Sequence, residues 1–198
     1  MEDMWEIERT CFDRGFSLVC GCDEAGAGPL AGAVYAAAVI LPAGLVIEGL
    51  TDSKKVTPKR RELLFDIICR DAVAWAVARA EVEEIDEINI LNARLLAMDR
   101  AIRALNPVPD YALIDGNRNN GISIANEMAV KGDARSASIA AASILAKVSR
   151  DRYMDEQAAL YPQYELERHK GYPTKRHYEL LRQYGPSPIH RRSFLKKL

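Results

Sequence analysis

Apolar positions follow two spacings along this chain, and together they predict strands and helices. Short apolar runs are typical of buried strands, and such runs cover residues 17–23, 31–41, 72–80, 111–114 and 128–130. The alanines of residues 31–41 are also compatible with a helix. Helices are predicted over residues 58–70, 83–105 and 136–160, the second from apolar residues at helical spacing and the third from a long Ala/Ser-rich stretch.

Turn-forming residues mark where these elements begin and end. Thr57-Pro58 supplies an N-cap and a first-turn proline, and Asn106-Pro107 ends the helix over 83–105. Prolines and glycines after residue 160 predict short helices joined by turns. Strands that come first and then alternate with helices predict an α/β domain with a mixed sheet flanked by helices. We expect this domain over residues 1–160, followed by a small helical extension over 161–198.

Composition and charge add a local feature to this picture. The chain has 198 residues, of which 48% are hydrophobic and 28% charged, as in a soluble globular domain. Its net charge is −1, but the stretch from Arg168 to Leu198 holds nine Lys or Arg and one acid, Glu179. This basic tail predicts a site for a polyanion, with a solvated helical surface as the alternative.

The remaining composition excludes several classes of protein. No stretch approaches the roughly 18 consecutive apolar residues that a membrane span needs, so no membrane association is expected. Four cysteines lack C-x-x-C spacing and are expected to be buried thiols of a cytoplasmic protein, at Cys11, Cys20, Cys22 and Cys69. We expect a monomer that needs no protein partner.

The candidate chemistry begins with two adjacent acids at the end of the first predicted strand. Asp23 and Glu24 are followed at once by Gly26-Ala27-Gly28-Pro29. Adjacent carboxylates near the interior of a fold repel each other unless a cation holds them. The glycines allow the backbone to approach a ligand closely, with N–H groups free to point at it. This combination indicates metal-dependent chemistry on a phosphorylated substrate.

Two further acids repeat this pattern. Asp115 ends a strand and precedes Gly116, and Asp133 follows Lys131-Gly132 after another strand. One Asp-Gly pair usually forms only a turn. Acids at several strand ends can instead converge at one edge of a sheet. Carboxylate oxygens suit Mg²⁺ or Mn²⁺ rather than zinc, and such sites typically hold two ions.

The adjacency of Asp23 and Glu24 raises a geometric question. Successive side chains of a strand point to opposite faces, so both reach one site only if the strand breaks there. Alternatively, Glu24 contributes its backbone carbonyl. A dinucleotide-binding loop is disfavoured, because Gly32 comes one place too late for G-x-G-x-x-G and Pro29 lies inside the loop. No G-x-x-x-x-G-K-[ST] stretch supports a nucleotide kinase.

An ordered set of short stretches covers residues 20–194. They are Gly21-Cys22-Asp23-Glu24-Ala25-Gly26, Gly28-Pro29-Leu30-Ala31-Gly32, Asp52-Ser53-Lys54-Lys55, Glu84-Ile85-Asp86 with Asn89-Ile90-Leu91, Leu113-Ile114-Asp115-Gly116-Asn117, Lys131-Gly132-Asp133, Ala140-Ala141-Ala142-Ser143-Ile144-Leu145-Ala146-Lys147-Val148, His169-Lys170-Gly171-Tyr172-Pro173-Thr174 and His190-Arg191-Arg192-Ser193-Phe194. In this order they resemble bacterial ribonuclease HII.

The resemblance implies an RNase H-like sheet with a C-terminal substrate-binding extension. It implies cleavage of the RNA strand of RNA–DNA hybrids and incision 5′ of single ribonucleotides in duplex DNA. Two-metal hydrolysis with Mg²⁺ or Mn²⁺ would leave 3′-OH and 5′-phosphate ends. The implied catalytic and metal-binding acids are Asp23, Glu24, Asp115 and Asp133. The implied substrate-binding residues are Gly26, Ala27, Gly28, Lys54, Lys55, Lys147, Tyr172 and Arg191.

Within this set, Tyr172 would stack under the sugar beside the ribose, and the loop over 26–28 would sense the 2′-hydroxyl through its backbone. Lys54 and Lys55 belong either to a solvated loop or to the surroundings of the scissile phosphate. Lys147 either covers the edge of the core or reaches the acids. His177 is expected on a helix surface.

One position departs from the family pattern. The family loop has Gly-Arg-Gly where this chain has Gly26-Ala27-Gly28. Backbone sensing needs only N–H and C=O groups, but the phosphate contact of the arginine is missing. An alternative function is therefore a non-catalytic or impaired nucleic-acid-binding variant of the same fold.

Overall fold

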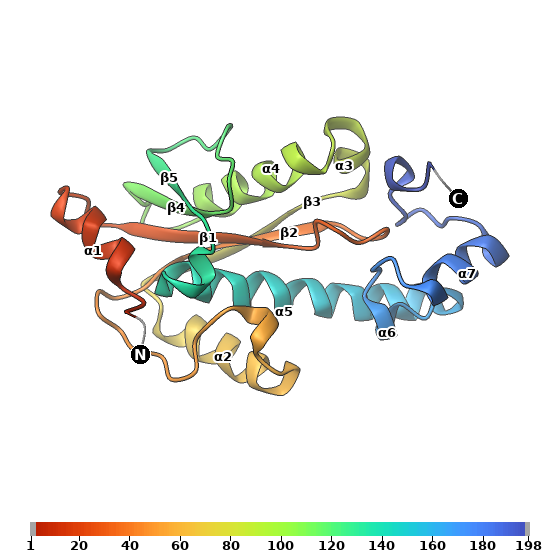
Figure 1. Cartoon of the computed structure of the whole chain (residues 1–198), viewed down its shortest axis with the longest axis horizontal. Helices are drawn as coiled ribbons and strands as arrows, with labels where there is room; N and C mark the ends of the chain where they lie inside the picture. Colours follow the sequence, from red (N-terminus) through yellow and green to blue (C-terminus); the bar gives the residue numbers. More distant parts are fainter. Residues whose placement is uncertain (1–2, 197–198) are drawn as a thin grey trace.

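A five-stranded mixed sheet forms the centre of the molecule in the computed structural model, which describes residues 3–196 (Figure 1). Its strands are β1 (Val19–Ala25), β2 (Val34–Ile40), β3 (Ala74–Ala80), β4 (Tyr111–Asp115) and β5 (Asn126–Ala129). They lie in the order β3-β2-β1-β4-β5. The β1–β2 and β2–β3 pairs are antiparallel, whereas β1–β4 and β4–β5 are parallel. The carboxyl ends of β1, β4 and β5 therefore share one edge of the sheet.

Helices cover both faces of this sheet (Figure 1). They are α1 (Glu6–Asp13), α2 (Pro58–Asp71), α3 (Val82–Ile88), α4 (Ile90–Arg103), α5 (Ala137–Leu160), α6 (Leu166–His169) and α7 (Lys175–Tyr184). Helices α3 and α4 lie on one face, and α5 with α2 on the other, while α6 and α7 pack near the end of α5 (Figure 1). The predicted fold class, a mixed sheet flanked by helices with a small helical C-terminal part, is confirmed.

The elements differ from the predicted ones at two places. The predicted helix over 83–105 is two helices, because Asn89 has a φ of 64° and its Oδ1 caps α4 by accepting from the N–H of Leu91 at 3.0 Å. Asparagine tolerates this left-handed region and is a preferred N-cap. The helix α1 was not predicted. Residues 34–40, whose alanines left a helix open, form the fully buried strand β2.

Very small side chains let α5 lie directly against β1. Ala140, Ala141 and Ala142 of α5 have no exposed surface. A Cβ at Gly21 would overlap the backbone of Ser138 and Ile139. This contact brings the beginning of α5 next to the strand that carries the first two acids.

The C-terminal extension is joined to the loop that follows β1. Residues Ala31 and His190 form an antiparallel bridge, and the N–H of Gly32 donates to the carbonyl of Ile189 at 2.8 Å. Leu30 shares an apolar cluster with Tyr164, Leu166, Leu180 and Leu181 of the extension. The extension and the loop 26–33 therefore form one packed unit, and the division into residues 1–160 and 161–198 stays a prediction.

Two expectations from composition can be compared with this fold. All four cysteines are free, with Cys11, Cys20 and Cys22 buried and Cys69 half-buried. Among the described residues, no helix has the length and hydrophobicity needed to cross a membrane.

The Gly21 contact yields a test of the fold. Gly21→Ala should lower the free energy of unfolding by about 3 kcal/mol, because the new methyl meets backbone atoms that cannot rotate away. Gly44→Ala is the control, since nothing lies near its Cβ position and only its φ of 75° is unfavourable, which costs about 1 kcal/mol. Chemical denaturation measures both, and equal losses would contradict the tight β1–α5 contact.

Candidate active site

Three of the predicted acids lie around the edge where β1, β4 and β5 end. Asp23 belongs to β1, Asp115 is the last residue of β4, and Asp133 lies in a 3₁₀ turn between β5 and α5. Cys22 of β1 pairs with Ile114 of β4, so Asp23 and Asp115 are level with each other on neighbouring strands. The parallel pairing brings together residues that are 92 positions apart in the printed sequence.

Each of these carboxyl groups is affected by its acidic neighbours. Burial raises the pKa of Asp23 well above its ordinary value, and the charges of Glu24 and Asp115 raise it further. Burial also raises the pKa of Asp115, although the amides of Gly132 and Asp133 stabilise its charged form. The pKa of Asp133 is raised by burial and then by Asp115. The acids therefore form one electrostatic group.

Glu24 approaches this group from the other side of the strand. The sequence required a break in the strand for both acids to share a site, but β1 continues through Ala25 and stays paired with β2. The Glu24 carboxylate instead accepts from Nη1 of Arg94, a residue of α4, at 3.2 Å. Burial and the Asp115 charge raise the pKa of Glu24, whereas Arg94 opposes them. No strand break is needed to bring its charge within reach of Asp115.

The donor set fits a hard divalent cation. It consists of carboxylate oxygens that raise one another's pKa, a situation that a cation relieves. Within residues 3–196, no three carboxylate, imidazole or thiol groups already form a ready coordination sphere. Without a cation, the like charges of the carboxylates keep them apart, and the ion pair with Arg94 holds Glu24 in its own position.

Lys54 provides a positive charge beside the acids. Burial disfavours its charged form, but Asp23, Asp52, Asp133 and Asp115 outweigh this and its pKa is raised. The charges of these acids therefore act on Lys54 without a direct ion pair among the described residues, and Lys54 and Lys55 are both exposed. Asp52 also accepts from the N–H of Lys54 at 2.9 Å, which begins the short 3₁₀ turn Ser53–Lys55.

Two buried arginines hold the loop that follows β1. The Arg191 guanidinium donates to the carbonyls of Gly26 at 2.7 Å, Ala27 at 3.0 Å, Pro29 at 2.8 Å and Gly32 at 2.9 Å. Neither Arg191 nor Arg150 forms an ion pair with a carboxylate in the described part of the chain. Carbonyl groups therefore make the direct polar contacts of both guanidinium groups, and Asp86 and Asp151 favour their charged forms only from further away.

Arg150 supports the same loop from α5. Its guanidinium donates to the carbonyls of Ala31 at 3.1 Å and Ala33 at 3.3 Å. The left-handed φ of 96° at Gly26, and the overlap that a Cβ there would have with Arg150, leave room only for glycine. With the loop carbonyls turned toward arginines, the N–H groups of Ala27 and Gly28 find no protein acceptor among the described residues.

Arg191 is predicted to bind substrate, and the structure places its side chain beneath the loop. Its side chain has no exposed surface, and its donors are occupied by the loop. Buried carbonyls require donors, and a guanidinium supplies several in one plane. Arg191 therefore holds the loop in place, and direct contact of Arg191 with a substrate stays a prediction.

Tyr172 lies next to this loop. A Cβ at Gly28 would be 3.9 Å from the Tyr172 ring, which is 40% exposed. The ammonium of Lys147 is 6.0 Å from the ring centroid and binds Asp151 at 2.6 Å. Lys147 is predicted either to cover the edge of the core or to reach the four acids. It does not contact the acids, because its ammonium pairs with Asp151. The Tyr172 ring therefore lies next to both Gly28 of the loop and Lys147.

A chain of histidines fixes the segment behind Tyr172. His177 Nδ1–H donates to the Tyr172 carbonyl at 3.0 Å, and its Nε2 accepts from His190 at 3.0 Å. The N–H of Ser187 donates to Nδ1 of His190, which leaves the proton of His190 on Nε2. His177 was expected on a helix surface, but it is fully buried because α7 turns it toward the extension's interior.

The basic tail is less available to a polyanion than its composition predicts. Arg176 pairs with Glu165, Lys170 with Asp155, and Arg168 with Glu165 at 3.4 Å. These acids precede the stretch that gives the tail its basic composition. A nucleic-acid-binding role for the tail stays a prediction.

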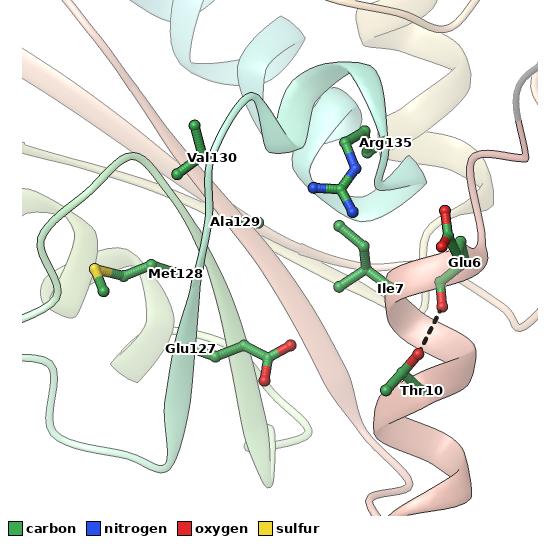
Figure 2. A pocket seen from close by; sticks show the side chains of 8 residues that line it. All are labelled: Glu6, Ile7, Thr10, Glu127, Met128, Ala129, Val130 and Arg135. Carbon is green, nitrogen blue, oxygen red and sulfur yellow. Dashed lines mark hydrogen bonds between the residues drawn. The ribbon is translucent and has the colours of Figure 1, made fainter.

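A separate hollow lies between α1 and β5 (Figure 2). It has a volume of about 380 Å³ and is lined by residues that include Ile7, Glu127, Val130 and Arg135. It contains none of the four predicted acids.

Three further residues, Asp52, Arg94 and Arg150, contribute to the site without belonging to the predicted set. An Asp that precedes a helical turn is a typical N-cap, so Asp52 carried a local signal. Arg94 and Arg150 carried none, because their partners lie 70 and more residues away in the sequence.

Known proteins that are similar to this chain belong to one group of ribonucleases. The family profile described as Ribonuclease HII matches residues 20–197. Ribonuclease HII of Caldicellulosiruptor saccharolyticus is 51% identical over 197 residues, which is 100% of this chain and 96% of that protein. Ribonuclease HII of Aliivibrio fischeri is 55% identical over 183 residues, covering 92% of this chain and 88% of that protein. The crystal structure of ribonuclease H2 from Pyrococcus horikoshii has a TM-score of 0.73 at 27% identity, covering 89% and 93% of the two chains.

The histidine chain predicts an unusual titration. Burial lowers the pKa of His177 and of His190 to about 4. Because these values lie below the ordinary 6.5, the imidazoles stabilise the fold fully above pH 6.5 and lose this contribution as the pH falls toward 4. NMR titration of the imidazole protons of the chain's three histidines should show no protonation of these two above about pH 5. A midpoint near 6.5 for either would contradict the buried chain.

Proposed function

This chain belongs to the ribonuclease HII family and is a ribonuclease H hydrolase, and we propose that it cleaves RNA–DNA hybrids and incises duplex DNA 5′ of single ribonucleotides. The products would carry 3′-OH and 5′-phosphate ends. The observation that carries this proposal is the electrostatic group of Asp23, Glu24, Asp115 and Asp133 at one edge of the sheet.

The four acids are the residues that would hold Mg²⁺ or Mn²⁺. Divalent ions in such a site activate a water and stabilise the attacking and leaving oxygens of a phosphodiester. This chain's own contribution is to bring the four carboxylates, two of them buried and two half-buried, to one edge of the sheet. Lys54 lies at the same place, where its ammonium can contact a phosphate oxygen once a cation neutralises the acids.

Selection of a ribonucleotide is proposed to occur at the loop over 26–28 and Tyr172. The free N–H groups of Ala27 and Gly28 can donate to a 2′-hydroxyl or phosphate oxygen, and the 2′-hydroxyl is what distinguishes RNA from DNA at one nucleotide. The Tyr172 ring beside Gly28 can stack on the adjacent sugar. Arg191 and Arg150 act on this step by holding the loop carbonyls away from the ligand.

The alternative is a nucleic-acid-binding protein without catalysis. The acids argue against it, because a pure binder gains nothing from negative charge where phosphates must lie. Incubation with duplex DNA that contains one ribonucleotide, with and without Mg²⁺ or Mn²⁺, tests the choice. Cleavage 5′ of the ribonucleotide only with metal supports the proposal, and binding without cleavage under every condition supports the alternative.

Neutralising one of the acids should lower the rate of cleavage and raise the stability of the metal-free protein. Asp23→Asn should reduce cleavage by about 10³-fold or more. In EDTA, the same change should increase the free energy of unfolding at neutral pH, because the raised pKa of Asp23 means that its charge destabilises the metal-free fold. This gain should disappear as the pH falls below the ordinary carboxyl value, where Asp23 is neutral in both states.

Asp66→Asn is the matched control, since Asp66 is exposed on α2. It should change neither cleavage nor denaturation. Full activity of Asp23→Asn, or full activity of the parent protein in EDTA, would contradict the assignment.

Ala27 gives a second prediction. The residue is half-exposed, so a longer side chain can extend from the loop. Ala27→Arg should restore a charge-assisted phosphate contact and raise single-turnover cleavage at one embedded ribonucleotide about tenfold. The gain should be largest at low salt, because one more phosphate contact steepens the log–log salt dependence by about 0.9.

A competing possibility is that Lys54 or Lys55 already replaces the missing arginine. In that case Ala27→Arg changes nothing, and Lys55→Ala is costly at low salt. Lys59→Ala is the control, because Lys59 is exposed nearby on α2. Equal rates for the parent and Ala27→Arg at two salt concentrations would refute a role for the missing arginine.

A further inference from the structure

A buried carboxylate comes from the N-terminal helix, which precedes the segment matched by the family profile. Glu8 of α1 has no exposed surface. Its Oε1 accepts from the Ser136 hydroxyl at 2.6 Å and from the N–H of Ser138 at 3.0 Å. Its Oε2 is buried and has no partner. The carboxylate therefore lies at the beginning of α5, among the first N–H groups of that helix.

Hydrogen bonds lead from Glu8 to the acids of the candidate active site. The Ser136 hydroxyl donates to Glu8 and accepts from the N–H of Ile139, so Glu8 sets the orientation of this N-cap. The N–H of Ser136 donates to the Gly132 carbonyl at 2.8 Å. The N–H of Gly132 donates to Oδ1 of Asp115 at 2.7 Å.

The turn between these groups contains Asp133. Residues Gly132–Ala134 form a single 3₁₀ turn held between β4 on one side and the beginning of α5 on the other. A Cβ at Gly132 would be 3.2 Å from Asp115 Oδ1 and 2.5 Å from the Ile139 side chain, so the turn has little room to shift. A second contact joins the same region to the N-terminal segment, because the N–H of Ala137 donates to the Met4 carbonyl at 2.7 Å.

Packing alone does not account for a carboxylate here. The buried Oε2 has no partner and costs stability, so packing gains nothing from a carboxylate at this place. What the carboxylate adds is an acceptor that fixes Ser136 and a negative charge at the positive end of a long helix. Both effects act on the turn that carries Asp133.

We propose that Glu8 is a positioning residue that holds Asp115 and Asp133 in the geometry needed to bind divalent metal. This inference rests on the proposed function, because it assumes that these acids are metal ligands. It extends the site to a helix that lies outside the matched family segment. The helix α1 then helps to position the acids of the active site in addition to packing on the core.

The test measures Mn²⁺ binding to the full chain by calorimetry, together with denaturation. Glu8→Met removes the acceptor and should weaken Mn²⁺ binding about three- to tenfold. It should also lower the free energy of unfolding, because the Ser136 hydroxyl and the Ser138 N–H lose their buried acceptor. Glu8→Gln keeps an oxygen acceptor for Ser136 and should bind Mn²⁺ within about twofold of the parent. Glu6→Gln, on the exposed side of α1, is the control and should bind like the parent.

Ser136→Ala keeps the inference testable if Glu8→Met does not fold. It breaks the same connection from the other end and should also weaken Mn²⁺ binding. Asp133→Asn tests the metal assignment separately from the role of Glu8. If Asp133→Asn weakens Mn²⁺ binding and neither Glu8→Met nor Ser136→Ala does, the role of Glu8 is overturned. If Asp133→Asn itself binds Mn²⁺ like the parent, the metal assignment in the proposed function fails.

Discussion

Repulsion among buried carboxylates is the constraint around which this molecule is built. Asp23 and Asp115 are brought level by the parallel pairing of β1 with β4, so the sheet fixes the positions of their backbones and only the side chains can turn apart. The surroundings offset this in several ways: the charge of Lys54 favours the ionised acids, Arg94 holds Glu24 on the opposite face, and amide groups point at Asp115. Each is a partial substitute for a cation. The site is therefore charged in a way that favours a metal before any substrate arrives.

Charged side chains also shape the loop after β1, where they set the direction of backbone groups. Its ligand-facing groups are backbone amides, which a side-chain substitution cannot remove, and their direction depends on where the carbonyls go. Arg150 and Arg191 capture those carbonyls from α5 and from the C-terminal extension. Because the guanidinium groups lack carboxylate partners, the local field behind the loop is positive. This arrangement explains how the loop can keep its form although Ala27 stands where the family has arginine.

The sequence predicted the fold class and most elements, because these depend on local patterns. Short apolar runs that end in Asp located the strand ends, and parallel pairing then placed Asp23 beside Asp115. Contacts across long separations left no such pattern. Arg94 meets Glu24 across 70 positions and Arg191 meets the loop across 165, so neither role could be predicted. The substrate-binding role of Arg191 is implied by the resemblance, and a basic residue in a basic tail gives no sign of its burial.

Gly21 shows that neighbouring residues of one sequence motif can be needed for two unrelated physical reasons. In Gly21-Cys22-Asp23-Glu24, the acids are there for their charge, whereas the glycine is there because α5 leaves no space for a side chain. A search that weights every position of the stretch equally treats a packing limit as if it were chemistry. A protein with the same acids but a larger residue at the first position would need a wider gap between strand and helix. In such a protein, the turn that carries its third acid would begin from a different place.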